Sequence, residues 1–167
     1  MSSYTQPQLD ALVSCPKTVT EPPKRAMRTE YRHSRNDMRL TSTDGANRFR
    51  AFLRQSLEFA EDFSVGLEYL PTDGRSFVLL RMNGQHDVSH DPQEVRAHFL
   101  YHIHRARAQQ VSQGFFNSLP SEATDLYASF KQAVVAFFRE VGIVEEPERF
   151  FPDLVELPLF RPREPQP

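Results

Sequence analysis

The sequence predicts an α+β domain in which helices pack against one face of a small antiparallel sheet. Three observations support this fold class: two strand-like segments joined by an Asp-Gly turn, a histidine-rich segment with the composition of a strand, and two segments whose apolar residues recur with helical spacing. A hydrophobic content of 39% in 167 residues is enough to give such a domain one buried core.

A β-hairpin is expected over residues 63–70 and 75–84. In "DFSVGLEYL" the apolar positions 63, 65, 67 and 69 alternate with polar or small ones, which is the pattern of a half-buried strand. The linking "PTDG" combines a proline with Asp-Gly and is typical of a tight turn. A third strand is expected over 98–105, because "HFLYHIHR" has the β-branched and aromatic content that favours strands.

Two amphipathic helices are expected to pack against this sheet. The first covers 46–60, "ANRFRAFLRQSLEFA", where arginines are left for solvent and the apolar residues near helical spacing are Phe49, Phe52, Leu53, Leu57 and Ala60. The second is a long C-terminal helix over 122–141, which ends at Gly142 and whose inward residues are Leu126, Phe130, Val134, Phe137 and Phe138.

The chain is expected to form one domain with proline-rich ends. Residues 1–27 form an N-terminal arm, in which "PQLDALVSCPK" has the apolar spacing of a short helix behind a proline. Residues 28–145 form the single α+β domain, where the segment before the turn "TDG" predicts an edge strand. Residues 146–167 form a proline-rich C-terminal tail.

Composition and charge exclude several classes of protein. A formal net charge of −2 argues against a uniformly basic surface for nucleic-acid binding, although it is compatible with a local basic patch. Cys15 is the only cysteine, so no intrachain disulfide forms, and neither a secretory signal nor an apolar run of ~20 residues is present. We therefore expect a cytoplasmic protein without a membrane partner. No nucleophile elbow or glycine-rich phosphate loop is found, and no cofactor is expected.

Histidines are concentrated in one segment, because five of the six fall between residues 81 and 108. The period of two in a strand over 98–105 places four residues on one face: His98, Leu100, His102 and His104. The same period groups four residues of the preceding strand, which leads into His86: Phe77, Leu79, Arg81 and Asn83. If the two strands are neighbours, an arginine, an asparagine and two or three histidines converge at one end of the sheet.

Histidines beside an arginine fit the cleavage of RNA without metal. This reaction needs a base for the 2′-hydroxyl proton, an acid for the leaving oxygen and a cation for the charge that develops on phosphate. Histidine has a pKa near neutrality, and the guanidinium group of arginine forks onto phosphate oxygens. His102 and His104 are therefore the candidate base and acid, with Arg81 as the cation. Arg105 and Arg107 are candidates for holding the flanking RNA backbone.

Two other interpretations of the histidines stay open. They could be structural, either hydrogen-bonded on a polar sheet face or, in a helix, paired as His98 and His102 at i and i+4. They could also bind a metal, because H-x-H on a strand presents two imidazoles to one ion and His86, His90 or His98 could be the third ligand. The nearby arginines would repel a divalent cation, so we expect no metal site.

Four segments carry a resemblance to known proteins: "RNDMRLTSTDGANRFRAFLR", "EDFSVGLEYLPTDGRSFVLLRMNGQH", "HIHRA" and "ATDLYASFKQAVVAFF". In this order they resemble a family of small uncharacterised bacterial proteins classed as a domain of unknown function. The hairpin ending in "LLRMNGQH" and the later "HIH" are also similar in plan to TumE-type toxins of toxin-antitoxin systems, in which a strand ending in Arg-x-Asn/Asp precedes paired histidines. The resemblance implies catalytic candidates at five positions: Arg81, Asn83, His86, His102 and His104.

Two further segments bear on partners. The apolar and acidic "VEEPERFFPDLVELPLF" either packs on the domain or docks on another protein, and the basic "PPKRAMRTEYRHSR" could contact phosphate. We therefore predict a bacterial toxin-antitoxin or phage-defence component with RNA as one partner and a cognate protein bound through the tail as another. The alternative from a different class is a non-catalytic interaction module, such as an adaptor or an antitoxin-like subunit.

Overall fold

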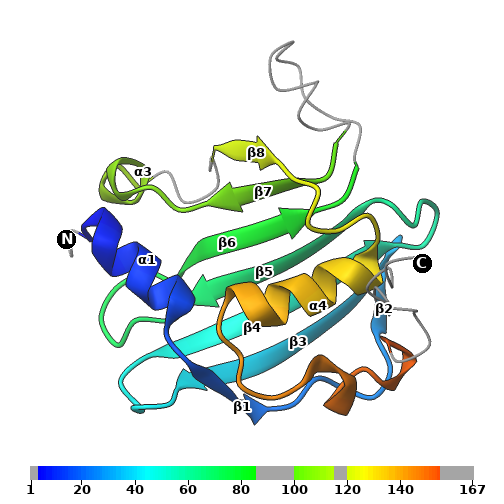
Figure 1. The fold of residues 1–167 in the computed structure, drawn as a ribbon, viewed down its shortest axis with the longest axis horizontal. Coiled ribbons are helices and arrows are strands. Elements are labelled where there is room, and N and C mark those ends of the chain that lie inside the picture. The colour runs from blue at the N-terminus through cyan, green and yellow to red at the C-terminus, as the bar shows by residue number, and fades with distance from the viewer. Residues whose placement is uncertain (1–3, 86–99, 115–119, 155–167) are drawn as a thin grey trace, which may run out of the picture.

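The computed structural model describes residues 4–85, 100–114 and 120–154, and within them eight strands form one antiparallel sheet (Figure 1). The strand order is β1-β3-β4-β5-β6-β7-β8, and β2 pairs with the same edge of β3 as β1 does. The elements follow one another as α1 (Gln6–Ser14), β1 (Lys17–Glu21), β2 (Arg28–Glu30), β3 (His33–Ser42), β4 (Arg48–Ser56), β5 (Phe63–Tyr69), β6 (Phe77–Asn83), β7 (His102–Arg105), α3 (Ala108–Ser112), β8 (Ser121–Ala123), α4 (Phe130–Glu140), η1 (Pro147–Arg149) and η2 (Pro152–Leu154).

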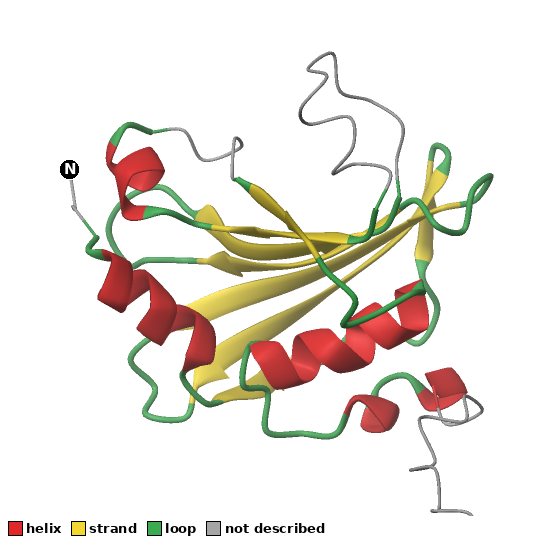
Figure 2. Cartoon of the chain, turned by 45° about the horizontal axis from the view of Figure 1, so that its top comes forward, coloured by secondary structure: helices red, strands yellow, loops and turns green. Residues whose placement is uncertain are grey.

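Helices α1 and α4 lie against one face of the sheet, which we call the helix-covered face (Figures 1 and 2). Alternate strand residues point into the core there because side chains of a strand alternate between faces. The core includes Met38, Leu40, Phe49, Leu53, Val65, Leu67, Met82, Phe137 and Phe138. We call the opposite face the polar face. The residues on it include Arg35, Asp37, Arg39, Arg50, Phe52, Arg54, Ser64, Gly66, Glu68, Arg81, Asn83, His102 and His104.

A buried lysine joins the two helices to the sheet. Lys17 is fully buried at the start of β1, and its ammonium donates hydrogen bonds to the carbonyls of Val13, Cys15 and Val141, each at 2.8 Å. These carbonyls lie at the carboxyl ends of α1 and α4, where helices leave acceptors without intrahelical partners. The ammonium also lies 4.7 Å from the centre of the Phe49 ring. Burial lowers the pKa of Lys17 below its ordinary value.

The helix expected over 46–60 is wrong, because residues 48–56 form β4. This strand pairs with β3 on one side and β5 on the other, with Phe49, Ala51 and Leu53 buried. The sequence "RFRAFLR" alternates with a period of two, and this alternation, not the near-helical recurrence of apolar residues, determines the structure. Leu57 is 56% exposed beyond the strand, so it does not belong to the apolar face that the helix required.

The long C-terminal helix expected over 122–141 is also wrong in length. Helix α4 has 11 residues and begins after Ser129, whose hydroxyl accepts a hydrogen bond from the amide of Gln132 as an N-cap. The preceding residues form β8 and a turn, where Leu126 is 57% exposed. The described part of the chain is therefore mainly an antiparallel sheet with short helices, and the α+β class with a long C-terminal helix does not hold.

Several other expectations are confirmed. The hairpin 63–70/75–84 corresponds to β5 and β6. The helix of the N-terminal segment is α1, whose N-terminus is capped by a capping box formed by Thr5 and Gln8. Of the strand expected over 98–105, residues 102–105 form β7, and positions 98 and 99 lie outside the described residues. The segment expected as an edge strand does form a strand, β3, but its expected place at the edge is wrong, because β3 has partners on both sides.

The start of the C-terminal tail packs on the domain. The rings of Phe150 and Phe151 lie 6.3 and 6.2 Å from the ring of Phe138 in α4, and Leu154 is buried. Residues 155–167, on which the proposed binding of a cognate protein depends, lie outside the described residues. Within the described ranges, no helix is long and apolar enough to cross a membrane.

Candidate functional site

The polar face brings four predicted site residues together on β6 and β7. Asn83 is the direct partner of His102, and Arg81 is the direct partner of His104. The expected pairing of these two strands is therefore confirmed, and we call these four residues the histidine cluster. Residue 86, the fifth position implied by the resemblance, lies outside the described residues.

Hydrogen bonds hold His102 in one orientation. Its Nδ1 lies 2.8 Å from the carbonyl oxygen of Leu100, and its Nε2 lies 3.3 Å from Nδ2 of Asn83. Because a carbonyl oxygen only accepts, Nδ1 carries the proton, and Nε2 accepts from the Asn83 amide. The amide is oriented in turn by the Ser64 hydroxyl, which donates to Asn83 Oδ1 at 2.8 Å. This chain of contacts fixes both the ring position and the tautomer of His102.

His104 and Arg81 complete the histidine cluster. The ring centroids of His102 and His104 are 5.0 Å apart with an interplanar angle of 76°, so the edge of one ring faces the other. Arg81 is partly buried, and its Nε has no hydrogen-bond partner in the part of the chain that the structure describes. Burial lowers the pKa of this guanidinium below its ordinary value, and the positive charge of Arg54 lowers it further. An anion placed beside Arg81 would offset both effects.

Tyr127 fixes the backbone beneath the histidine cluster. Its hydroxyl lies 2.8 Å from the carbonyl oxygen of His102 and 3.0 Å from that of Asn83, so it can donate to either of the two paired residues. Burial raises the pKa of Tyr127 well above its ordinary value, which keeps the hydroxyl protonated as a donor. The sequence analysis placed this residue inside a helix and assigned it no role.

The two arginines expected to hold RNA backbone are engaged in ion pairs. Arg105 is the last residue of β7, and its side chain lies on the helix-covered face, where its Nη2 is 2.7 Å from Glu140 Oε1. Arg107 follows β7, and its Nη2 lies 2.8 Å from Glu122 Oε1. Their proposed role stays a prediction, and Arg105 is not on the face that carries the histidine cluster.

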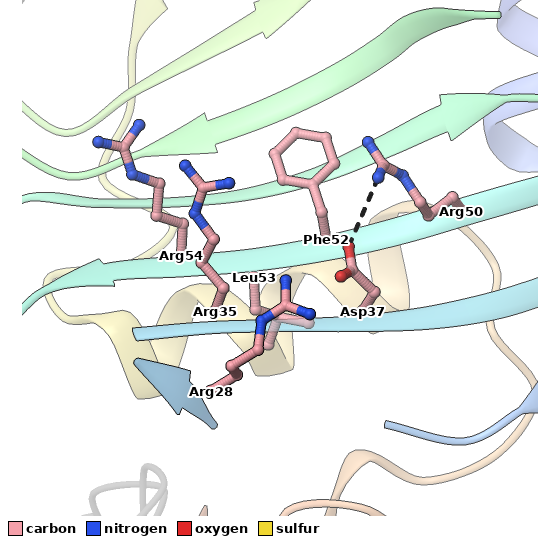
Figure 3. Close-up of a pocket in the computed structure, with 7 residues that line it drawn as sticks. All are labelled: Arg28, Arg35, Asp37, Arg50, Phe52, Leu53 and Arg54. Carbon is pink, nitrogen blue, oxygen red and sulfur yellow. Dashed lines mark ion pairs between the residues drawn. The ribbon is translucent and has the colours of Figure 1, made fainter. Parts of the chain in front are cut away.

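The structure shows a second feature of the polar face, which we call the arginine pocket. It has a volume of about 260 Å³, and its lining residues are Arg28, Arg35, Asp37, Arg50, Phe52, Leu53 and Arg54 (Figure 3). Gly66 lies beneath the Phe52 ring, since a Cβ at position 66 would come within 2.2 Å of the ring. Glycine at this position therefore lets the ring lie over β5, between the pocket and the strand that carries Arg81.

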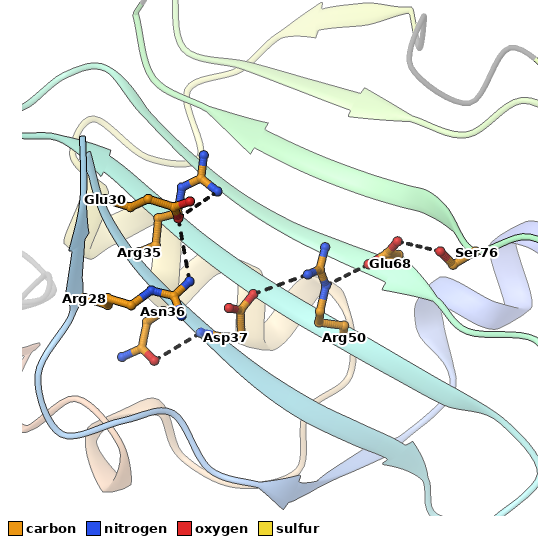
Figure 4. Close-up of polar contacts among 8 residues, drawn as sticks. All are labelled: Arg28, Glu30, Arg35, Asn36, Asp37, Arg50, Glu68 and Ser76. Carbon is orange, nitrogen blue, oxygen red and sulfur yellow. Dashed lines mark hydrogen bonds and ion pairs between the residues drawn. The ribbon is translucent and has the colours of Figure 1, made fainter. Parts of the chain in front are cut away.

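Three of the four arginines that line the arginine pocket form ion pairs with acidic side chains. Arg50 Nε lies 2.7 Å from Glu68, and the Arg50 guanidinium lies 3.8 Å from Asp37 (Figure 4). Arg28 and Arg35 share Glu30 at 3.6 and 3.2 Å.

Arg54 differs from the other arginines of the pocket. Its Nη2 donates to Nε2 of His33 at 2.6 Å, and no described acidic side chain forms an ion pair with it. The positive charge of Arg54 also acts on Arg81, whose pKa it lowers. The alternation of Arg48, Arg50, Phe52 and Arg54 could have predicted this row if the segment had been interpreted as a strand.

In the metal interpretation, the two ligands on β7 are His102 and His104, and both lie on the polar face. Among the described residues, no group of three His, Cys, Asp or Glu side chains is arranged to hold an ion. The third ligands considered from the sequence, at positions 86, 90 and 98, all lie outside the described residues.

Comparisons of the chain with protein-family models, with curated proteins and with solved structures found no match.

Proposed function

We propose that the polar face binds RNA and that the histidine cluster cleaves it without metal. The observation that supports this most is the direct cross-strand pairing of Arg81 with His104 and of Asn83 with His102. This pairing puts two imidazoles and one guanidinium on neighbouring strands, which is the set of groups that transesterification of RNA requires.

His102 and His104 take different roles in this proposal. In the neutral, Nδ1-protonated form of His102, the lone pair on Nε2 accepts from the Asn83 amide. The 2′-hydroxyl takes the place of this donor when RNA binds, and His102 is then the base that removes its proton. The 2′-oxygen attacks phosphorus, and the bond from phosphorus to the 5′-oxygen breaks. His104, in its protonated form, gives its proton to that oxygen, while Arg81 stabilises the charge on the phosphate. The products are a 2′,3′-cyclic phosphate and a free 5′-hydroxyl.

Burial of the cluster sets a requirement for this mechanism. His102 is fully buried and His104 is 6% exposed. Cleavage therefore requires that RNA binding opens access to the edge of both rings. Asn83 and Ser64 are positioning residues, because they orient His102 and do not themselves carry a titrating proton.

The biological setting that we propose is a bacterial toxin-antitoxin or phage-defence system. It is supported by the resemblance of the Arg81-x-Asn83 strand and the paired histidines to TumE-type toxins. A toxin of this kind would act on RNA in the cytoplasm and be held inactive by a cognate protein.

The test is RNA cleavage in EDTA by wild-type protein, His102→Ala and His104→Gln. A matched control is Arg139→Ala, which changes an exposed residue of α4 on the other side of the sheet. We expect the wild type and the control to produce 2′,3′-cyclic phosphate ends and each histidine variant to lose about 100-fold in rate or more. Cleavage by His104→Gln at the wild-type rate would overturn the proposed chemistry and favour the non-catalytic interaction module. Melting curves establish that all four proteins are folded.

A further inference from the structure

We propose that the arginine pocket is a subsite for single-stranded RNA, in which Arg35 and Arg54 hold a backbone phosphate and Phe52 stacks on a base. This inference deepens the proposed function and rests on it for the identity of the ligand as RNA. It assigns a ligand to residues on β2, β3 and β4 that lie outside the histidine cluster.

The charge of the pocket fits a phosphodiester. Four guanidinium groups line it with one carboxylate, that of Asp37. Arg50 is paired at 2.7 Å with Glu68 and Arg35 at 3.2 Å with Glu30, whereas Arg54 has only the imidazole of His33 as a hydrogen-bond partner among the described residues. Guanidinium groups form paired hydrogen bonds with phosphate oxygens, and a ligand with this charge would join Arg54 to Arg35, its direct cross-strand partner.

The position of Phe52 fits a stacked base. Its ring stands on the polar face among arginines and lies over Gly66 (Figure 3). It is partly exposed, whereas Phe49 of β4 and Phe63 of β5, which point the other way, are buried. A ring of this kind binds any base by stacking but requires that the base be unpaired, so the pocket is expected to prefer single strands to duplexes.

A row of direct strand partners connects the pocket with the histidine cluster. Arg54 is paired with Ser64, Ser64 with Asn83, and Asn83 with His102. Neighbouring strands lie about 4.8 Å apart, so the three steps cover about 14 Å. At a rise of about 3.4 Å per stacked nucleotide, this distance corresponds to about four nucleotides. In this row the only residue between Arg54 and the histidine cluster is Ser64, whose small side chain leaves the strand surface low enough for RNA to cross.

The experiment measures binding of a fluorescent eight-nucleotide 2′-O-methyl RNA, which lacks the attacking hydroxyl and is not cleaved. The variants are Arg35→Ala/Arg54→Ala, the milder Arg54→Gln and Phe52→Leu, with Arg139→Ala as the matched control. Fluorescence anisotropy is recorded over a range of salt concentrations, after melting curves have shown that each protein is folded.

We expect the double arginine variant to bind at least tenfold more weakly than wild type. Its slope of log affinity against log salt should fall by about 0.7, because the two arginines neutralise one phosphate and each neutralised phosphate of a single strand contributes about 0.7. Phe52→Leu should weaken binding about tenfold with an unchanged salt slope, since stacking is not ionic. For Arg54→Gln, the decrease in the salt slope should be about half of that seen with the double variant. Arg139→Ala should have the same slope and affinity as wild type.

The outcomes separate this inference from the proposed function. If the arginine and Phe52 variants bind the oligomer as tightly as wild type, or if wild type does not bind it, the subsite is overturned whether or not RNA is cleaved. If wild type binds through these residues but does not cleave RNA, the cleavage mechanism is overturned and the subsite stands. A duplex that binds as tightly as the single strand would overturn the role of Phe52.

Discussion

Two desolvated cations on opposite faces of the sheet differ in their surroundings. On the helix-covered face, Lys17 is fully buried, and three carbonyl oxygens at 2.8 Å accept its three ammonium protons. On the polar face, Arg81 is partly buried, its Nε has no hydrogen-bond partner among the described residues, and the positive charge of Arg54 adds to the effect of burial on its pKa. Burial lowers the pKa of both groups, but among the described residues no acidic side chain forms an ion pair with Arg81, whereas three carbonyls offset the cost of burying Lys17.

This difference separates a residue that stabilises the fold from one that is suited to bind a ligand. Lys17 completes hydrogen bonds that the ends of two helices would otherwise lack, so its charge contributes to the structure. The charge of Arg81 makes no comparable contribution to the folded protein alone. A buried cation without an anion is typical of a functional site. The predictions below test this contrast through the free energy of unfolding.

The largest loss of stability is expected from Lys17→Met. The methionine side chain fills a similar volume but leaves the carbonyls of Val13, Cys15 and Val141 without their donor, which should lower the free energy of unfolding by about 3 kcal/mol. Urea unfolding monitored by circular dichroism measures this as a lower midpoint at constant m-value. Lys131→Met is the matched control, because Lys131 makes one exposed contact, to the Asp153 carbonyl. A loss below about 1 kcal/mol would contradict the structural role of Lys17.

An intermediate loss is expected from Tyr127→Phe. Removal of the hydroxyl leaves the carbonyls of Asn83 and His102 short of one donor in a buried position, which should cost about 1–2 kcal/mol. The same urea experiment applies, with Tyr31→Phe as the control because Tyr31 is 95% exposed. Equal midpoints for the two variants would show that Tyr127 does not hold β6 and β7 together.

The smallest effect on stability is expected from Arg81→Met. Loss of a desolvated charge that forms no ion pair with a described residue should leave the free energy of unfolding within about 0.5 kcal/mol of wild type or raise it slightly. RNA cleavage should nevertheless fall about 100-fold, because the phosphate loses its cation. A destabilisation similar to that of Lys17→Met would remove the contrast between the two faces and assign Arg81 to the fold.

The histidine cluster could be predicted from the sequence because it depends only on the period of two and on adjacent strands. His102 and His104 alternate with Ile103, and the hairpin before them ends with Arg81 and Asn83, so their convergence required one correct pairing. The roles of these residues as base, acid and phosphate ligand remain predictions.

The arginine pocket and the fold class could not be predicted from the same pattern. In "RFRAFLRQSLEFA" the apolar residues fit both a strand and a helix, and the choice is made by hydrogen bonds to the preceding and following strands, β3 and β5, which lie outside the segment itself. A helix over this segment would spread Arg50 and Arg54 over a solvent-exposed face, so the helix prediction could not lead to the pocket. Tyr127 was missed for a related reason, because its importance depends on two backbone carbonyls.

The expected grouping of Phe77 and Leu79 with Arg81 failed because of a β-bulge. Leu67 pairs with Leu80, but Glu68 pairs with Val78, so Leu79 is an extra residue on β6. Phe77 and Leu79 are 3% and 1% exposed, whereas Arg81 lies on the polar face. Strict alternation is a good rule only where no residue is inserted.

This bulge also determines where the chain can change length during evolution. Additions to the loop at 70–76 alter only the connection between two strands, because the bulge and the pairing beyond it keep their alignment. Deletion of one residue between Leu80 and Asn83 would instead exchange the two faces of the strand. A guanidinium would then point into the core, and a leucine or methionine would point to the surface. Relatives that keep the histidine cluster should therefore vary in length before the bulge and conserve the number of residues after it.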